Sequence, residues 1–180
     1  EHQKIKKIEN NIFLFYGEND GYKNQVIKDI FIDNNKGNIE RFDEGEVLNN
    51  FENFISSLIN KSFFDEFKLI LISRVSEKTV KLIDELLDKK INDVTIILNA
   101  GSLEKKSKLR SIFEKNQNLV CVPFYKDDSR TLIQLANNFF KKNKISMSQE
   151  IVNLIVERSS GDRINLDNEL NKISLFLLNK

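Results

Sequence analysis

The chain has 180 residues, and 28 lysines and arginines nearly balance 27 aspartates and glutamates, which leaves a formal net charge of +1 at pH 7. This balance argues against tight, charge-driven binding to nucleic acid by the chain alone. No apolar run approaches the roughly 18 residues that a membrane-spanning helix needs, and with one cysteine and one histidine an intrachain disulfide or a histidine–cysteine metal site is excluded.

Strand and helix patterns alternate over the first two thirds of the chain. Three of the predicted strands are nearly continuous apolar runs, which is typical of strands covered on both faces in a parallel sheet. Amphipathic helical patterns lie between the strands, so we expect a three-layer α/β sheet with right-handed crossovers. The predicted strands are Asn11–Tyr16, Asn38–Phe42, Lys68–Ser73, Val94–Asn99 and Leu119–Val122. Cys121 lies in the last of them, where a buried thiol fits a reducing, cytoplasmic location.

The first strand runs directly into the turn 17–21, Gly-Glu-Asn-Asp-Gly, and an amphipathic helix follows. A nucleotide-binding α/β protein carries its phosphate loop at this place, with glycines for close backbone approach and a lysine for charge. Here the lysine is missing, and Glu18 and Asp20 would repel phosphate. We therefore expect a tight turn in which Asn19 or Asp20 caps the helix; the alternative is an acidic metal or phosphoacceptor site that includes Lys126.

The ends of the third and fourth strands lack the carboxylates of an ATPase. The third strand ends in Ser73 and Arg74, where an ATPase would hold Mg²⁺ with acidic side chains. Asn99 comes directly after Ile96-Ile-Leu98 at the end of the fourth strand, either as a polar sensor or as a residue that closes the strand. The sequence thus indicates an ATPase-like fold without an ATPase site, and we expect no cofactor and no metal.

After Pro123 the pattern becomes entirely helical. Three helices are predicted, at Ser129–Asn143, Ser148–Ser159 and Ile164–Leu178. Ser146 with Gln149 three residues later forms a capping-box pattern, Gly161 is a helix stop, and Asp162 is a cap for the next helix. We place a domain boundary within 124–128, which gives an α/β domain at 1–126 and a small three-helix domain at 127–180.

Two segments are candidates for binding a partner. Phe63 and Phe64 are adjacent and precede two acidic residues, so they either anchor a partner's hydrophobic pocket or seal the edge of the domain. A basic cluster in the segment 103–110 is either a solvated helix face or a contact for DNA phosphates or an acidic partner. This cluster consists of Lys105, Lys106, Lys108 and Arg110.

Taken in order, these features resemble the delta subunit family of the bacterial DNA polymerase III clamp loader. The matching segments are the strand and turn at 13–20, Ser62-Phe-Phe before the strand at 68–72, the stretch 97–109, and Gly161-Asp162 with 168–172. The resemblance covers nearly the whole chain, although no single motif is decisive.

The resemblance implies an AAA+-like parallel sheet with flanking helices, followed by a helical lid, and no nucleotide turnover. It implies that the chain binds the ring-shaped sliding clamp and opens it for loading onto primed DNA. Within the family an apolar pair inserts into the clamp, and this pair corresponds to Phe63 and Phe64, with Ser62 and Phe67 beside them; the family more often has a Leu-Phe-type pair.

The resemblance further implies membership in the DNA polymerase III holoenzyme, a nucleotidyltransferase complex (DNA-directed DNA polymerase), and DNA as a partner in the assembly. The other loader subunits would bind through a C-terminal collar domain that this sequence lacks, so we expect a fragment. Active relatives place a phosphate-sensing arginine just after a Gly-Asp pair, but Arg163 lies one residue early and is expected to be structural. The alternatives are a nucleotide-binding AAA+ ATPase and a DNA-binding or regulatory α/β module.

Overall fold

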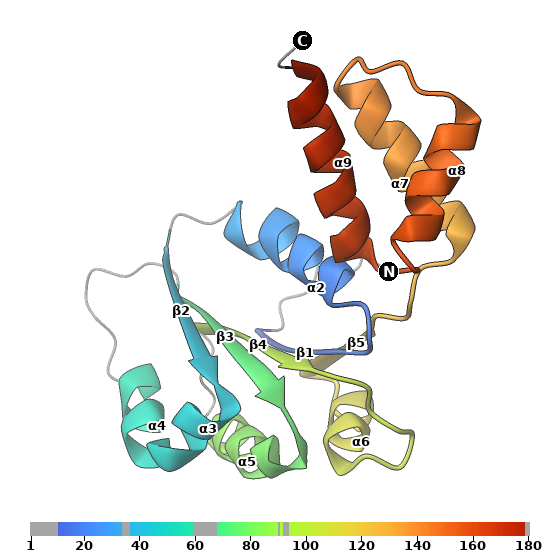
Figure 1. Ribbon diagram of the computed structural model, residues 1–180. Coiled ribbons are helices and arrows are strands. Elements are labelled where there is room, and N and C mark those ends of the chain that lie inside the picture. The colour runs from blue at the N-terminus through green and yellow to red at the C-terminus, as the bar shows by residue number, and fades with distance from the viewer. Residues whose placement is uncertain (1–10, 34–36, 60–67, 90, 92–93, 179–180) are drawn as a thin grey trace. The chain divides into compact units, whose positions relative to one another are not determined.

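The computed structural model describes residues 11–33, 37–59, 68–89, 91 and 94–178. The chain divides into two compact units (Figure 1). The sheet unit comprises Glu1–Gly17 and Gln25–Pro123, and the helical unit comprises Glu18–Asn24 and Phe124–Lys180. A short segment of the turn after the first strand thus groups with the C-terminal helices, a feature that the sequence did not indicate.

The sheet unit contains five parallel strands in the order β2-β3-β4-β1-β5. The first strand therefore lies between two strands that come late in the chain, with Leu14 paired in register to Leu98 on one side and to Cys121 on the other. The predicted strands and their parallel arrangement are confirmed. Their bounds are β1 Ile12–Tyr16, β2 Asn38–Asp43, β3 Lys68–Val75, β4 Val94–Ala100 and β5 Leu119–Pro123.

Helices cover both faces of the sheet, as the continuous apolar strands predicted. Alternate residues of β1 point to opposite faces: Ile12 and Leu14 join a core shared with the helices that follow β2, β3 and β4. Phe13 packs on the other face, with its ring centroid 5.0 Å from that of Phe31 in the π-helix η1 (Ile27–Ile32). The helices below the sheet in Figure 1 are α3 (Glu44–Asn49), α4 (Phe51–Ile59), α5 (Val80–Asp88) and α6 (Lys108–Lys115), and a 3₁₀ turn, η2 (Glu77–Thr79), precedes α5.

The helical unit packs α7 (Ser129–Lys142), α8 (Gln149–Arg158) and α9 (Arg163–Leu178) around its own apolar core. The start of α2 (Asp20–Val26) belongs to the same unit. The three predicted C-terminal helices are confirmed. No helix among the described residues is long and apolar enough to span a membrane.

The predicted caps of the C-terminal helices are correct for α9 and wrong for α8. Asp162 caps α9, because its Oδ1 accepts the Asn165 N–H at 2.8 Å, and Gly161 before it adopts a φ of +77°, which favours glycine. Helix α8 is capped by Ser148, whose side chain accepts the Ile151 N–H at 3.4 Å, and not by Ser146. The Ser146–Gln149 pattern fails because the helix starts two residues further along the chain.

Candidate functional site

The turn after β1 begins with a glycine that its conformation requires. Gly17 has a φ of +122°, which an L side chain rarely adopts, and its N–H donates to the Gly101 carbonyl at 2.9 Å. Both glycines follow neighbouring strands of the sheet unit. The glycine of this turn therefore serves the backbone geometry at the carboxyl edge of the sheet.

Asn19 caps α2 and also ties the turn to the chain after β5. Its Oδ1 accepts the Tyr22 N–H at 3.0 Å, and its backbone N–H donates to the Phe124 carbonyl at 3.2 Å. Its Nδ2 donates to the Tyr125 carbonyl at 3.0 Å and to Asp127 Oδ2 at 2.9 Å. Of the two caps predicted for this helix, Asn19 and Asp20, the structure has Asn19, which is buried at 6% exposure.

Arg163, at the start of α9, forms a bidentate ion pair with Asp127. Its Nε lies 2.7 Å from Asp127 Oδ2 and its Nη2 lies 2.5 Å from Asp127 Oδ1. The two side chains are only 11% and 7% exposed, and the guanidinium lies 4.0 Å from the centroid of the Tyr22 ring. Bidentate, charge-assisted pairs of this kind are among the strongest hydrogen-bonded contacts in proteins. Arg163 is therefore bound to the chain's own carboxylate, in agreement with the structural role predicted for it.

The start of α2 packs tightly on the start of α9. A Cβ placed on Gly21 would lie 3.0 Å from both the Arg163 Cβ and the Ile164 Cγ1. This second glycine of the turn therefore allows close helix–helix contact within the helical unit. We name the set Asn19, Gly21, Tyr22, Asp127 and Arg163 the turn cluster.

Both acidic residues of the turn are paired with lysines. Asp20 Oδ1 lies 2.8 Å from the Nζ of Lys23, which is buried at 1% exposure, and Glu18 lies 3.0 Å from Lys126. The lysine nearest to the turn is thus bound to a neighbouring carboxylate. Sequence reasoning missed this role of Lys23, although the i, i+3 spacing from Asp20 is the usual signal of such a pair on a helix.

The ends of β3 and β4 carry polar groups without a metal-binding set. Ser73 and Asn99 are paired in register near the ends of β3 and β4. Arg74 has a φ of +57° at an irregularity in β3 and forms an ion pair with Asp43. Within the described ranges, no group of three or more His, Cys, Asp or Glu side chains could hold a metal ion.

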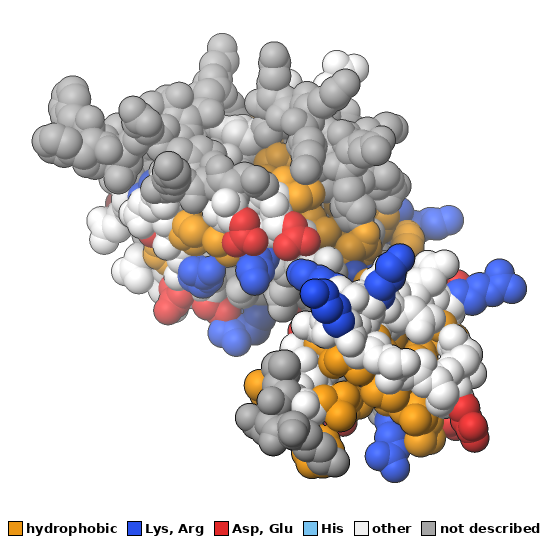
Figure 2. Space-filling model, turned by 90° about the horizontal axis from the view of Figure 1, so that it is seen from above, with side chains coloured by type: hydrophobic (Ala, Val, Ile, Leu, Met, Phe, Trp, Pro, Cys, Tyr) orange, Lys and Arg blue, Asp and Glu red, His pale blue; other side chains and the backbone are white. Residues whose placement is uncertain are grey.

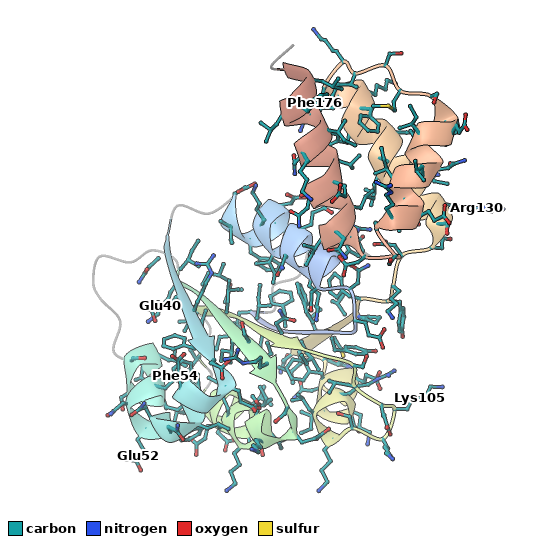
Figure 3. The ribbon with its side chains drawn as sticks, in the orientation of Figure 1. Glu40, Glu52, Phe54, Lys105, Arg130 and Phe176 are labelled. Carbon is teal, nitrogen blue, oxygen red and sulfur yellow. The ribbon has the colours of Figure 1, made fainter. Side chains whose placement is uncertain are left out.

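The structure separates the four residues of the predicted basic cluster. Lys105, Lys106 and Lys108 are exposed, and Lys105 extends into solvent away from the sheet unit (Figure 3). Arg110 is only 17% exposed: its Nε lies 2.7 Å from Glu114, and its guanidinium lies 5.0 Å from the centroid of the Tyr16 ring. Arg110 therefore supports the packing of α6, whereas the three lysines can reach a partner.

The predicted clamp-binding residues Ser62, Phe63, Phe64 and Phe67 lie outside the described residues. The structure instead reveals exposed apolar side chains that sequence reasoning missed, at the end of α9 and on α8. Leu175 and Phe176 are each 62% exposed, and Ile151 and Leu154 are 45% and 50% exposed. Hydrophobic side chains at this end of the helical unit are visible in Figure 2. The signal was the run Leu175-Phe-Leu, because consecutive residues of a helix point in different directions and cannot all face the core.

The order of the parallel strands and the flanking helices define an AAA+-like fold. No protein-family model matches the sequence, and no curated protein sequence does. Solved structures do match. The DNA clamp loader delta protein of Bacillus subtilis matches with a TM-score of 0.59 and 15% identity, over 97% of this chain and 56% of that one.

Two replication initiator structures match as well. Domain III of the Thermotoga maritima replication initiation protein DnaA has a TM-score of 0.55 and 13% identity, over 97% of this chain and 80% of that one. A DnaA structure bound to AMPPCP and single-stranded DNA has a TM-score of 0.62 and 14% identity, over 97% of this chain and 59% of that one. At these identities the likeness shows the fold, and the chain spans just over half of the clamp loader delta protein.

Proposed function

We propose that this chain is a non-catalytic clamp-loader subunit that binds a sliding clamp and opens it for loading onto primed DNA. The observation that carries the proposal is the turn cluster: on an AAA+-like fold, the chain's own side chains occupy the turn after β1. An ATPase of this fold needs a lysine and open backbone N–H groups at this turn. In this chain the nearest lysine, Lys23, is buried and paired with Asp20, while the Asn19 side chain caps the helix and Glu18 is paired with Lys126.

A clamp loader delta protein is among the solved structures that share this fold, and it matches over 97% of this chain, as the two DnaA structures also do. We further propose that Phe63 and Phe64 are the clamp anchors, with Ser62 and Phe67 beside them. The pair follows α4 closely, since that helix ends at Ile59. Two phenyl rings that enter a preformed pocket can supply about 2–4 kcal/mol each. Membership in a polymerase III holoenzyme, and with it contact to the other loader subunits and to DNA, belongs to the same proposal.

The test is a binding titration of the purified chain with the sliding clamp of the same organism. The double variant Phe63→Ala/Phe64→Ala should bind the clamp at least about 100-fold more weakly, because each tenfold loss corresponds to about 1.4 kcal/mol. A matched control is Leu175→Ala/Phe176→Ala, which also removes two adjacent apolar side chains, both exposed on α9. This control should bind the clamp with unchanged affinity.

Thermal unfolding followed by circular dichroism must accompany the titration. An anchor pair on the surface leaves the unfolding temperature nearly unchanged, whereas a pair that seals the core lowers it by several degrees. If the Phe63→Ala/Phe64→Ala variant unfolds normally and still binds the clamp with native affinity, the anchor assignment is wrong. If the native chain does not bind the clamp, the proposed function is wrong.

Two other functions remain distinguishable by simple measurements. A nucleotide-binding AAA+ ATPase is the first, since a DnaA structure that holds AMPPCP has a similar fold. Calorimetric binding of ATP with Mg²⁺ tighter than about 100 μM, or about −5.5 kcal/mol, would favour it. A DNA-binding or regulatory module would instead show salt-sensitive DNA binding in the absence of clamp binding.

A further inference from the structure

The carboxylate of Asp127 has three hydrogen-bond donors from two distant segments of the helical unit. Its Oδ2 accepts from Asn19 Nδ2 at 2.9 Å and from Arg163 Nε at 2.7 Å, and its Oδ1 accepts from Arg163 Nη2 at 2.5 Å. Asn19 also caps α2 by accepting the Tyr22 N–H. The Asp127 carboxylate therefore connects the N-terminal end of α2 to Arg163 at the start of α9. An arginine guanidinium and a side-chain amide can donate hydrogen bonds to a phosphate in the same way.

We propose that Asp127 is a built-in anion that takes the place of a ligand phosphate in the turn cluster. The guanidinium of arginine matches the geometry of carboxylate and phosphate equally well. A buried guanidinium also requires an anion, because an unpaired buried charge strongly destabilises the fold. In this chain the anion is covalently part of the segment after β5, so the turn 18–24 is held to α9 without any ligand.

The close packing around Gly21 supports this role. The space beside the start of α2 is filled by the first residues of α9, since a Cβ added to Gly21 would lie 3.0 Å from the Arg163 Cβ. The Tyr22 ring covers one face of the guanidinium at 4.0 Å and packs its own edge against Phe124, with ring centroids 5.4 Å apart. The contacts fix the arginine side chain in the position that meets the carboxylate.

A route from solvent to Asp127 also exists. A surface cavity of about 350 Å³ in the helical unit is lined by Asp127, Ser129, Asn153, Glu157 and Gly161, together with apolar side chains. Because Asp127 itself lines this cavity, removal of its carboxylate would open toward the cavity the place where Arg163 and the Asn19 amide now bind that carboxylate. A tetrahedral oxyanion from solution can then enter and replace the missing group.

The experiment measures the unfolding temperature of the native chain, Asp127→Ala and Asp128→Ala in sodium chloride, sulfate and phosphate at equal ionic strength. Asp127→Ala should lower the unfolding temperature in chloride by about 5–10 °C, since it breaks a buried pair. Millimolar phosphate or sulfate should restore most of this loss. Asp128→Ala is the matched control, because it removes the neighbouring carboxylate, which caps α7 by accepting the Thr131 N–H at 2.7 Å.

The native chain and Asp128→Ala should show only the small, non-saturating stabilisation that sulfate and phosphate give most proteins. The added variant Asp127→Ala/Arg163→Ala should lose the saturable response, because the receiving guanidinium is gone. If Asp127→Ala is unfolded in chloride, the folded fraction regained in phosphate replaces the unfolding temperature as the readout.

The inference is overturned if Asp127→Ala responds to phosphate no more than Asp128→Ala does, or if the native chain shows the same saturable response. It goes beyond the proposed clamp binding and does not depend on it, since both readouts are made without a partner. A chain that fails to bind a clamp but gains a phosphate response in Asp127→Ala would disprove the proposed function alone.

Discussion

The thiol of Cys121 shows how strongly one half-buried position alters side-chain chemistry. Burial, followed by the nearby Glu114 carboxylate, raises the pKa of the thiol from 9.0 to about 11. At pH 8 the reactive thiolate is therefore about a hundredfold scarcer than for a thiol of pKa 9. We expect slow modification by iodoacetamide at pH 8 in the native protein and fast modification in urea, measured by mass spectrometry. Equal rates in both conditions would contradict the burial of this thiol.

The sign of the pH effect of Cys121 follows from the same shift. Because the pKa of the folded state lies above the ordinary value, the thiol's contribution to stability is complete below about pH 9. The contribution is lost as the pH rises toward 11. This residue therefore has no influence on how stability varies with pH near neutrality.

At the residue scale, local contacts could be predicted from the sequence and distant ones could not. Asn19 and Asp162 were predicted as caps because each bonds a backbone N–H only three residues away. The pairing of Arg163 with Asp127 spans 36 residues, and nothing in the local sequence selects this carboxylate from the adjacent Asp128. The two aspartates separate only when α7 forms, since Asp128 becomes its N-cap.

At the scale of elements, the carboxylate of Glu77 connects η2 to the start of α6. The Glu77 carboxylate accepts the Ser107 hydroxyl, and its Oε2 accepts the Leu109 N–H at 3.0 Å. The hydrogen bond from Ser107 is the main reason that the pKa of Glu77 is lowered. A carboxylate that accepts N–H groups at a helix N-terminus stabilises that helix. We expect Glu77→Gln to lower the free energy of unfolding by about 1 kcal/mol, measured with urea at pH 7.

A matched control for this variant is Asp84→Asn, which removes an exposed carboxylate in the middle of α5. It should change stability by less than about 0.5 kcal/mol. Because the pKa of Glu77 is lowered by folding, its contribution is present above the ordinary value of 4.5 and is lost as the pH falls through the folded value. The difference between native chain and Glu77→Gln should therefore shrink in acid; a constant difference would show that the charge of Glu77 is not involved.

The strands could be predicted from the sequence, because buried parallel strands appear as nearly continuous apolar runs. The order of the strands in the sheet could not be predicted. The runs in β1, β3 and β4 contain many β-branched residues and phenylalanines, so their type was clear. The position of β1 between β4 and β5 depends on pairings about 80 to 110 residues apart in sequence, which no local pattern specifies. The same limit applies to the segment 18–24, which leaves the sheet unit to pack with the C-terminal helices.

At the scale of the whole molecule, the distribution of charge matters more than its total. The net charge is only +1, yet Lys105, Lys106 and Lys108 are all exposed within four residues before and at the start of α6. One of the three is partly neutralised, since Lys106 lies 3.0 Å from Glu104. Such a group can contact at most about three phosphates, so DNA binding by this chain should be weak and nonspecific, with a shallow dependence on salt.

The prediction is tested by the slope of the logarithm of the binding constant for double-stranded DNA against the logarithm of the salt concentration. If the three lysines contact phosphates, Lys105→Ala/Lys106→Ala/Lys108→Ala should reduce the magnitude of the slope by about 2–3, because each phosphate contact contributes about 0.9. Lys141→Ala/Lys142→Ala/Lys144→Ala is the matched control, since it removes three exposed lysines from the end of α7 and the residues after it. The control has the same net charge, so a nonspecific loss of attraction would reduce both slopes equally and would refute a role for the segment before α6. A tight complex that survives physiological salt would show a DNA-binding surface elsewhere on the chain.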